Sequence, residues 1–563
     1  MKRQLAISLL FSLLLLSPIL QAQDLENLKD QKPLSISGNV GLGMQTYASS
    51  RENPSRQPFI WSVYGNPTLS IYGLTLPFSF VLSRKNEEFR QPFNQFGVSP
   101  YYKWIKLHIG FRNMSFSDFT LNGHVFNGVG IELDPGNWRF GAMYGTLLAP
   151  ISPDFTEDYL VEPTYKRKGY SVKIGYGTSS NYFDLILFKG RDLINSIDRP
   201  LDSVIVNPQE NLVLGIKTQQ RLFNTLVFSA DVGLSGWTSN LFAEGMDNTD
   251  IPLSGIINNF LDVNYSTQFL TAVKSSLSFR IRQVNLRLQY QRIEPDYQTM
   301  GAYFFNNDLE NITFSPGWSM FKRKLTVNTS VGWQRNNLFE DKSNQTNRRI
   351  NSVQVNYSPV AKLNFSGSYT NFQINQRQIN AVTRDVIDSL QLVQFSNNLS
   401  FNMNYNFGNK VKVYGISVGY TNQSMSQEMS NEGLGNSDSR SISPHFTFRF
   451  SNRDSKWGYR GTINYNNFEN STISTFRWGC NLNTNKSFAD DKFSLNGTLA
   501  YNVTQLDGEQ GGKTLRFGIR GDYKPAEKHS IGFGTNLIRQ HSANERIRNF
   551  NEFLGNLTYS YAF

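Results

Sequence analysis

Short segments in which apolar and polar residues alternate recur along almost the whole chain, and this recurrence most constrains its fold. In Leu363 to Tyr369, Leu, Phe and Tyr alternate with Asn and Ser, and Phe493 to Tyr501 follows a similar rule. Alternation with a period of two gives a β-strand one apolar and one polar face. The sequence therefore predicts an all-β protein made of two-faced strands.

The breaks between these segments are alternately short and long. Short breaks carry turn chemistry, as in Asp134 to Asn137 and Gly408 to Lys410, and a further one is placed at His108 to Gly110. Long breaks are mostly polar loops, such as Leu148 to Arg167. Counting the segments predicts about 26 antiparallel strands, with 22 to 28 as the range, and an even number is usual for up-and-down membrane barrels.

Composition also favours a transmembrane antiparallel β-barrel. Hydrophobic residues make up 39% of the 563 residues, aromatic residues 14%, and Gly occurs 43 times. A packed core of this length normally contains more Leu, Ile and Ala, whereas a barrel needs apolar side chains only toward lipid. A soluble β-propeller or β-helix would need a signature in each repeat, and we find none.

The N-terminus has the pattern of a secretory signal. Lys2 and Arg3 precede the apolar run Leu5 to Leu16, and we expect cleavage near Ala22, which lowers the formal net charge from +11 to +9. No later run of 18 apolar residues predicts a transmembrane helix. The expected organisation is a signal peptide at 1–22, a periplasmic lead at 23–33 and a barrel at 34–563.

The final segment, Glu552 to Phe563, ends the chain on an aromatic residue. Its apolar positions alternate with polar ones and are Phe553, Leu557, Tyr559, Tyr561 and Phe563. A closing strand of this kind resembles that of bacterial outer-membrane β-barrel proteins. The resemblance implies insertion into outer-membrane lipid, and it implies that the assembly machinery of that membrane reads Tyr559, Tyr561 and Phe563. The Asn-rich and Tyr-rich strands are similar in style to Bacteroidetes barrels.

Three classes of outer-membrane barrel do not fit. A TonB-dependent transporter carries a plug domain before its barrel, and an Omp85-type assembly factor carries periplasmic repeats, but the first predicted strand here begins at Leu34. A fatty-acid-transporter-like barrel begins with a hatch containing Asn-Pro-Ala, which Asn66-Pro67-Thr68 matches poorly. We therefore expect an outer-membrane barrel, and the sequence motifs do not identify its specific family.

Arginine recurs at positions that the alternation places inside the barrel. A charge facing lipid near the midplane costs about 2 to 4 kcal/mol, so these side chains point into the lumen if they lie at membrane depth. They either favour anionic solutes or an acidic plug, or they pair with carboxylates such as Asp522 and Glu294 and stiffen the wall. The predicted lumen-lining residues are Arg280, Arg282, Arg287, Arg449, Arg460, Arg477, Arg516 and Arg520.

The sequence supports neither catalysis nor a cofactor. His445 is in phase with Ser443 and Thr447, but no neighbouring acid completes a catalytic set. Asp247 to Asp250 offers oxygen ligands without the Gly and Glu of a calcium loop, and the single Cys480 excludes a zinc-thiolate cluster. We assign no catalytic residue, metal or cofactor, and an exported chain has little access to nucleic acid.

The size of the barrel leaves two functions open. About 26 strands enclose a lumen that would leak unless something fills it. Either long loops fold inward, with Gly236 to Tyr265 as the expected constriction, or a second protein plugs or caps the barrel. The first arrangement predicts a channel for polar, perhaps anionic, solutes. The second predicts a barrel that anchors, assembles or helps to export a surface protein, with Asn371 to Leu392 as another loop able to pack at the mouth.

Overall fold

The computed structural model describes most of the chain after the N-terminal region. The described ranges are 33–51, 56–72, 74–83, 95–152, 163–197, 206–223, 225–246, 259–303, 306–378, 392–429, 437–542 and 548–563. The expected signal peptide therefore lies outside the described residues. So do the Asp247 to Asp250 segment and the apolar part of the Asn371 to Leu392 loop.

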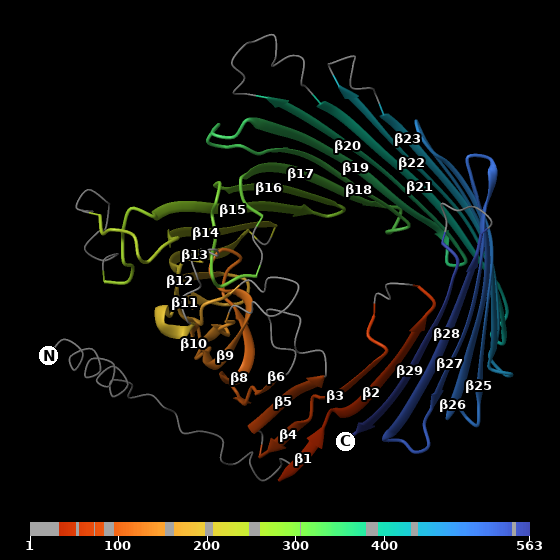
Figure 1. Ribbon diagram of the computed structural model, residues 1–563, viewed down its shortest axis with the longest axis horizontal. Coiled ribbons are helices and arrows are strands. Elements are labelled where there is room, and N and C mark those ends of the chain that lie inside the picture. Colours follow the sequence, from red (N-terminus) through yellow and green to blue (C-terminus); the bar gives the residue numbers. More distant parts are fainter. Residues whose placement is uncertain are drawn as a thin grey trace.

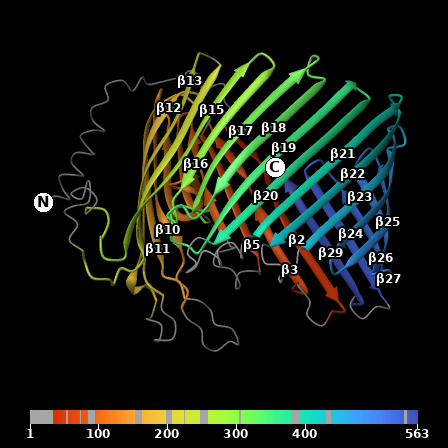
Figure 2. The same cartoon turned by 90° about the horizontal axis from the view of Figure 1, so that it is seen from above.

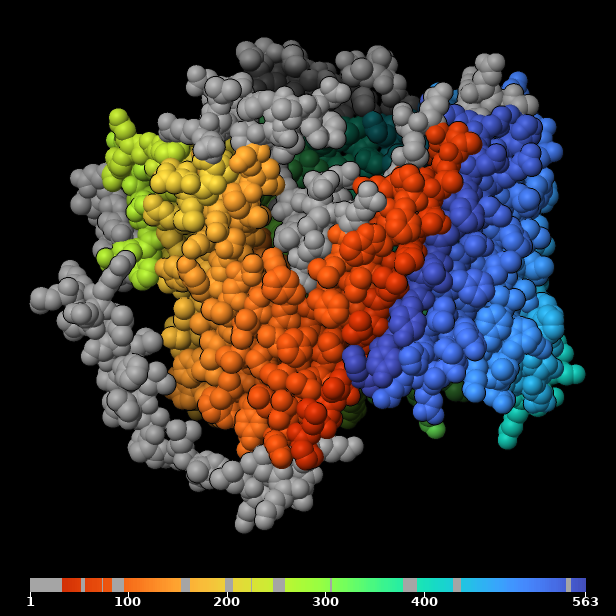
Figure 3. All heavy atoms as spheres, turned by 60° about the horizontal axis from the view of Figure 1, so that its bottom comes forward, coloured from red at the N-terminus to blue at the C-terminus, as the bar shows by residue number. Residues whose placement is uncertain are grey.

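One antiparallel sheet closes on itself to form a barrel (Figure 1). It contains 29 strand segments. In three cases two consecutive segments form one interrupted strand of the barrel, and we call each such full strand a stave. The barrel therefore has the predicted 26 staves. The seam joins β2 (Asn39–Ser49) to β29 (Phe550–Ala562), from Asn39 opposite Ala562 to Ser49 opposite Glu552. In Figure 3 the N-terminal strands, in red and orange, lie directly against the C-terminal strands, in blue.

The strands fall into broken and continuous staves. The three broken staves are β1 (Leu34–Ser37) with β2, β3 (Phe59–Gly65) with β4 (Thr68–Ile71), and β6 (Gln95–Val98) with β7 (Tyr101–Tyr102). The continuous staves of the first half are β5 (Leu74–Ser83), β8 (Ile105–Ser115), β9 (Asn122–Leu133), β10 (Trp138–Leu148), β11 (Arg167–Gly177), β12 (Tyr182–Asp192), β13 (Glu210–Leu222), β14 (Leu226–Thr238), β15 (Thr267–Ile281) and β16 (Val284–Ile293). Those of the second half are β17 (Leu309–Met320), β18 (Leu325–Arg335), β19 (Asn344–Val360), β20 (Leu363–Gln378), β21 (Leu392–Gly408), β22 (Lys412–Met429), β23 (Ser437–Asn452), β24 (Trp457–Asn470), β25 (Ser474–Phe488), β26 (Phe493–Leu506), β27 (Glu509–Tyr523), β28 (His529–His541) and β29.

The strands are tilted relative to the barrel axis, and their connections differ at the two ends (Figure 2). Tight turns join β9 to β10, β15 to β16 and β21 to β22, where the sequence predicted short breaks. We call this the turn end and the opposite one the loop end. A one-turn 3-10 helix, Ile194–Ser196, lies in one of the loops, and no helix in the described part of the chain is long and apolar enough to cross a membrane.

The predicted break at His108 to Gly110 is wrong. These residues lie inside β8, and the turn before this strand is at Lys103 and Trp104. Gly110 was mistaken for a turn residue because it does have a left-handed φ of +87°. A Cβ there would meet the carbonyl oxygen of Phe96 at 2.6 Å, so the glycine permits a kink against the broken stave rather than a reversal of the chain.

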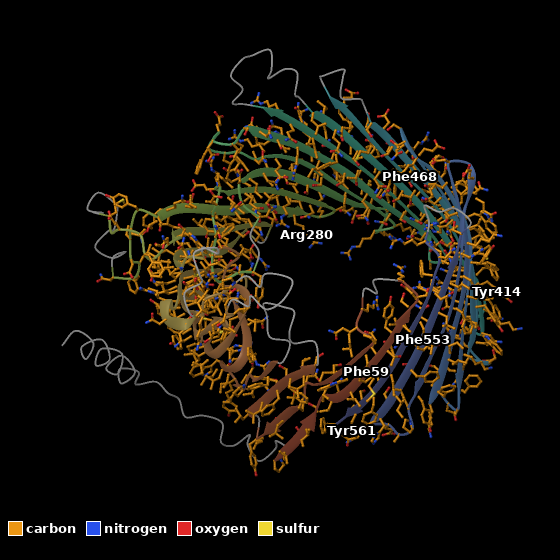
Figure 4. All side chains as sticks on the ribbon, in the orientation of Figure 1. Phe59, Arg280, Tyr414, Phe468, Phe553 and Tyr561 are labelled. Atoms are coloured by element: carbon orange, nitrogen blue, oxygen red, sulfur yellow. The ribbon has the colours of Figure 1, made fainter. Side chains whose placement is uncertain are left out.

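The outer surface of the barrel is apolar. One row of it runs across five neighbouring strands as Leu482, Leu499, Phe517, Leu537 and Phe553, each opposite the next. Near the turn end the outward side chains are aromatic and in contact, as between Phe407 and Tyr414 and between Trp457 and Tyr459. Figure 4 shows Tyr414 on the outer surface and Arg280 pointing into the enclosed space. An apolar band with an aromatic border is the surface of a barrel that crosses a membrane.

The two faces of one strand give a matched test of this assignment. Leu482 lies on the outer face of β25 and is 51% exposed, while Asn481 next to it faces the lumen. We expect Leu482→Arg to lower the free energy of unfolding by about 2 to 4 kcal/mol in lipid vesicles, because it places a charge in hydrocarbon. Asn481→Arg should cost well under half of this in the same denaturant titration. Equal costs would contradict the assignment of the faces.

Candidate solute pathway in the lumen

Two connections fold back into the barrel and cover part of its inner wall. The first insert comprises residues 116–121, between β8 and β9, and the second comprises residues 294–303, between β16 and β17. They meet at Phe119 and Tyr297, whose rings form an edge-to-face pair with centroids 6.0 Å apart. Both side chains are almost completely buried, at 2% and 0% exposed. The inserts therefore form a small packed body inside the lumen.

Charged residues of the wall hold the first insert. The carboxylate of Asp231, on β14, accepts a bond from the hydroxyl of Ser117 at 2.5 Å and another from the backbone N–H of Asp118 at 3.0 Å. Lys274, on β15, forms an ion pair with the side chain of Asp118 at 2.7 Å. Lys217, on β13, donates to the carbonyl of Phe116 at 3.3 Å. Three neighbouring strands thus bind one short segment.

The second insert binds both the wall and the first insert. The hydroxyl of Tyr297 donates to the carbonyl of Phe119, and the hydroxyl of Thr299 donates to that of Thr120, each at 2.8 Å. Burial raises the pKa of Tyr297, so its hydroxyl stays protonated and remains a donor. The side-chain oxygen of Asn211, on β13, accepts from the backbone N–H of Met300 at 3.1 Å. Most polar groups that the insert carries into the lumen are thereby paired.

Apolar side chains fill the space between the inserts and the wall. One cluster joins Phe116, Leu121 and Met300 to wall residues of β8 to β13, and a second joins Phe119 and Tyr297 to wall residues of β15 to β17. Gly233, on β14, leaves the necessary room, because a Cβ there would lie 2.4 Å from the Tyr297 hydroxyl and 2.7 Å from Phe119. The lumen beside β8 to β16 is therefore packed like the interior of a soluble protein.

The expected constriction at Gly236 to Tyr265 is not found in the described residues. Its described C-terminal part packs on the outer face, where Leu261 buries itself against Leu212 of β13. The carboxylate of Glu210 holds it there by accepting from the backbone N–H of Asp262 at 2.9 Å. Only residues 259–261 of the aliphatic run are described, and Leu261 packs against the lipid-facing row of β13 rather than in the lumen. The Val386 to Leu390 segment lies outside the described residues.

The remaining inner wall, from β20 to β29, is polar and rich in asparagine. Asparagine amides can donate and accept hydrogen bonds without carrying charge. In contrast to the wall beneath the inserts, this wall carries few apolar side chains. Its lumen-facing asparagines include Asn398, Asn402, Asn404, Asn464, Asn466, Asn481, Asn483, Asn485, Asn496, Asn502, Asn536 and Asn556.

All eight arginines that the sequence singled out lie on the lumen side or at its turn end. Arg280 and Arg287 are on β15 and β16, and Arg282 is in the turn between these strands. The other five are on the asparagine-rich wall, where Arg449 of β23 lies directly opposite Arg460 of β24. The remaining positions on this wall are Arg477 on β25 and Arg516 and Arg520 on β27.

Few of these guanidinium groups have an acidic partner. Arg520 forms an ion pair with Asp522 at 3.3 Å. Arg477 and Arg516 donate to uncharged side chains, those of Thr504 and Asn536, both at 3.2 Å. The other five form no ion pair with any carboxylate in the described part of the chain. Within the described part of the chain, Arg520 is therefore the one of the eight that is paired with a carboxylate.

Two adjoining hollows mark this arginine-asparagine wall. One, of about 390 Å³, is lined by Arg449, Arg460 and Asn483, and the other, of about 400 Å³, by Arg516, Arg520 and Asn536. Asn496 and Thr498 line both, so the two are continuous across β23 to β29. The combined surface offers charged and neutral donors to an anionic or polyhydroxylated solute.

In the wall near the inserts, two arginines form ion pairs with buried carboxylates. Arg139 pairs with Asp184 at 3.0 Å and Arg167 pairs with Asp192 at 2.7 Å. Close by, the Ser99 hydroxyl is 3.1 Å from Nδ1 of His108, whose Nε2 is 2.8 Å from Glu132. The sequence did not suggest this Ser-His-Glu relay, because its members are on different strands. Ser99 is only 9% exposed, so we interpret these hydrogen bonds as structural. They connect the broken stave β6–β7 to β8 and β9.

His445, the one histidine considered for catalysis, faces the lumen from β23 and lies opposite Gly419 and Asn464. No acid lies opposite it in either neighbouring strand, so the structure adds no partner to the set that the sequence left incomplete. The described residues contain no group of three or more His, Cys, Asp or Glu side chains that could hold a metal ion.

Comparison with known proteins gives structural neighbours only. No protein-family model matches the sequence, and no curated protein matches it. The P pilus usher (PapC) translocation pore is 11% identical with a TM-score of 0.34, covering 94% of this chain and 100% of its own. The outer membrane protein OpdK from Pseudomonas aeruginosa (9%, TM-score 0.30) and OccAB2 of Acinetobacter baumannii (9%, 0.31) each cover 70% of this chain and 99% and 98% of their own. These scores record a general likeness, and the fold assignment rests on the strand pairing.

Removing the aromatic contact between the inserts should release them. We expect Tyr297→Ala to weaken the docking of residues 116–121 by about 3 to 5 kcal/mol, because it deletes a fully buried ring and a buried hydrogen bond. Hydrogen exchange at the amides of residues 117–121 measures this. Tyr265→Ala, at a ring that is 72% exposed, is the matched control and should leave those amides protected. Unchanged exchange in Tyr297→Ala would contradict the packed body.

An ion pair secures a loop at the loop end of the barrel. Asp308 is buried, which by itself would raise its pKa. Bonds from the Lys342 ammonium at 2.6 Å and the Leu338 backbone N–H at 3.0 Å outweigh this, so the pKa of Asp308 lies below its ordinary value. The bond to Asp308 likewise raises the pKa of Lys342.

This pair predicts an acid-sensitive loop. A depressed carboxyl pKa contributes stability above the ordinary value of about 3.9, and this contribution is lost as the pH falls through the folded pKa. We expect residues 337–342 to be protected at neutral pH and released in strong acid, as measured by hydrogen exchange corrected for intrinsic rates. Asp308→Asn should remove the transition. A transition that persists in this variant would assign it to another group.

Proposed function

We propose that the chain is an outer-membrane channel for polar solutes, with a preference for anions. The observation that carries this proposal is the arginine-asparagine wall of β23 to β29. It has five lumen-facing arginines, while Asp522 and Glu552 are its acids within the regular, paired part of the strands. Glu552 is bound by Arg51 at 3.0 Å, which leaves the wall with an excess of positive charge.

The arrangement of Arg449 and Arg460 supports an anionic solute in particular. Like charges that lie directly opposite each other on neighbouring strands destabilise a sheet. The described residues supply no carboxylate to offset this cost. A passing anion would offset it transiently, binding strongly enough to enter and weakly enough to leave because the neighbouring groups are neutral amides.

The two inserts support a defined route rather than an unobstructed lumen. They occupy the space beside β8 to β16, where Arg139 and Arg167 are paired with Asp184 and Asp192. A solute would therefore pass along the opposite wall, where Arg449 and Arg460 form no ion pair with any described carboxylate. In this proposal the tight turns face the periplasm, as in other barrels of this kind.

The alternative, a barrel that anchors or helps to export a surface protein, has no specific observation in its favour. Conductance in planar bilayers separates the two functions, because a channel passes ions without any partner. A purified chain that stays closed under all voltages and salts would instead favour a plugged scaffold.

Selectivity provides the sharper test. In a potassium chloride gradient we expect an anion-selective reversal potential, which Arg449→Gln with Arg460→Gln shifts toward zero or cation selectivity. The control removes two positive charges from the outer face, by Lys486→Gln and Arg539→Gln, and should keep the original selectivity. Equal shifts in both double variants would show that net charge, and not the lumen wall, sets the selectivity.

A further inference from the structure

A second group of cations surrounds a hollow at the turn end of the barrel. The hollow, of about 280 Å³, lies between the β15–β16 turn and the β17–β18 turn. Arg280 and Arg282 line one side of it, and Lys322 and Arg323 line the other. Asn285, Ser319 and Asn328 also line it, from lumen-facing positions of β16, β17 and β18. It is separated along the sheet from the wall of β23 to β29.

None of these four cations forms an ion pair with a carboxylate in the described part of the chain. The neighbouring turns offer none either. The five turn-end connections from β13–β14 to β21–β22 contain Arg282, Lys322, Arg323, Lys324, Lys362 and Lys410, and no Asp or Glu. Charges of one sign around a concave surface focus an attractive potential for ions of the other sign.

The conformation of the β17–β18 turn does not require basic residues. Phe321, Lys322 and Arg323 have left-handed φ values of 52°, 58° and 68°. The β25–β26 turn repeats this geometry at Ala489, Asp490 and Asp491, with φ values of 49°, 51° and 68°. There the charge is negative, and Asp491 is neutralised by Lys456 at 2.8 Å.

The same backbone therefore accepts acidic and basic side chains equally well. Glycine or asparagine would suit the left-handed positions better than either. The cations around the hollow are thus a feature of the surface and not a consequence of the turn.

We propose that this hollow is a binding site for a soluble, multiply charged oxyanion of the phosphate class. A monocarboxylate would offset one of four converging charges, whereas a phosphate or pyrophosphate group offsets several. A phosphate group can also accept bidentate hydrogen bonds from more than one guanidinium group. The lumen-facing asparagines and serine supply the neutral donors that such oxygens also use. The site would bind anions at the turn end of the lumen before or after they pass through the barrel. This role in passage, unlike the binding itself, rests on the proposed channel.

The experiment is calorimetric titration of the detergent-solubilised full chain with pyrophosphate, phosphate and acetate at low ionic strength. We expect pyrophosphate to bind more tightly than phosphate, and acetate not to bind at the same concentrations. Arg282→Gln with Arg323→Gln should weaken pyrophosphate binding at least tenfold. Lys362→Gln with Lys410→Gln removes the same charge from turns outside the hollow and should change the affinity by less than twofold. Folding of each variant is checked by the heat-dependent shift of its electrophoretic mobility.

Several results would overturn the proposal. Equal weakening in both double variants would mean general attraction to a basic rim and no site. Binding that disappears in nanodiscs made with an anionic phospholipid, but persists with a zwitterionic one, would assign the cations to lipid headgroups. A chain that conducts anions but does not bind pyrophosphate refutes the site alone. A chain that binds pyrophosphate but never conducts refutes the channel and leaves the site standing.

Discussion

The structure depends on one constraint, which is that no backbone N–H or C=O can be left unpaired in hydrocarbon. A sheet satisfies this only by closing, so the pairing of β2 with β29 is the condition for every other strand to lie in the membrane. Closure with 26 staves then fixes a wide circumference. A wide lumen must be filled or lined, and this chain does both, on different sides.

The two sides of the lumen follow opposite physical rules. Beside β8 to β16, the inserts bring aromatic and aliphatic residues against the wall, and buried charges such as Asp184 and Asp192 are paired with arginine. Beside β20 to β29, the wall is left polar, with guanidinium groups among neutral amides. The first arrangement minimises the cost of buried charge, and the second keeps charge available to a solute. A lumen with one packed side and one polar side combines a rigid interior with a possible route for polar solutes.

Local chemistry made the fold predictable from sequence. The alternation in segments such as Phe493 to Tyr501 and the turn residues at Asp134 to Asn137 act within a few positions, so strand number, outward face and most turns could be predicted. Gly110 misled because a left-handed glycine serves a kink as well as a turn. The candidate site could be predicted only in part. The alternation of apolar and polar residues placed the arginines on the lumen face, but it could not show that Arg449 lies opposite Arg460.

The inserts were missed for a different reason. Their partners are far away in sequence, as with Phe119 and Tyr297, and the alternation of the strands does not show whether a loop folds into the lumen. The aliphatic run that ends at Leu261 was expected to form a constriction instead, and Leu261 itself packs on the outer face. One available signal was the aromatic and sulfur-containing residues in otherwise polar connections, Phe116, Phe119, Tyr297 and Met300, together with glycine on the facing strand at Gly233. Aromatic loop residues opposite wall glycines are thus a useful pattern to examine in large barrels.

The contacts of the first insert also impose an order on assembly. Ser117 and Asp118 follow β8, yet the groups that hold them, Asp231 and Lys274, belong to β14 and β15. The loop cannot dock until seven further strands are in register, and the second insert must wait until the β16–β17 connection is complete. Docking therefore couples strands that are far apart in the chain through a long loop closure. The sector from β8 to β17 is thus held together by the inserts in addition to its strand pairing, whereas the asparagine-rich strands are joined mainly through the sheet.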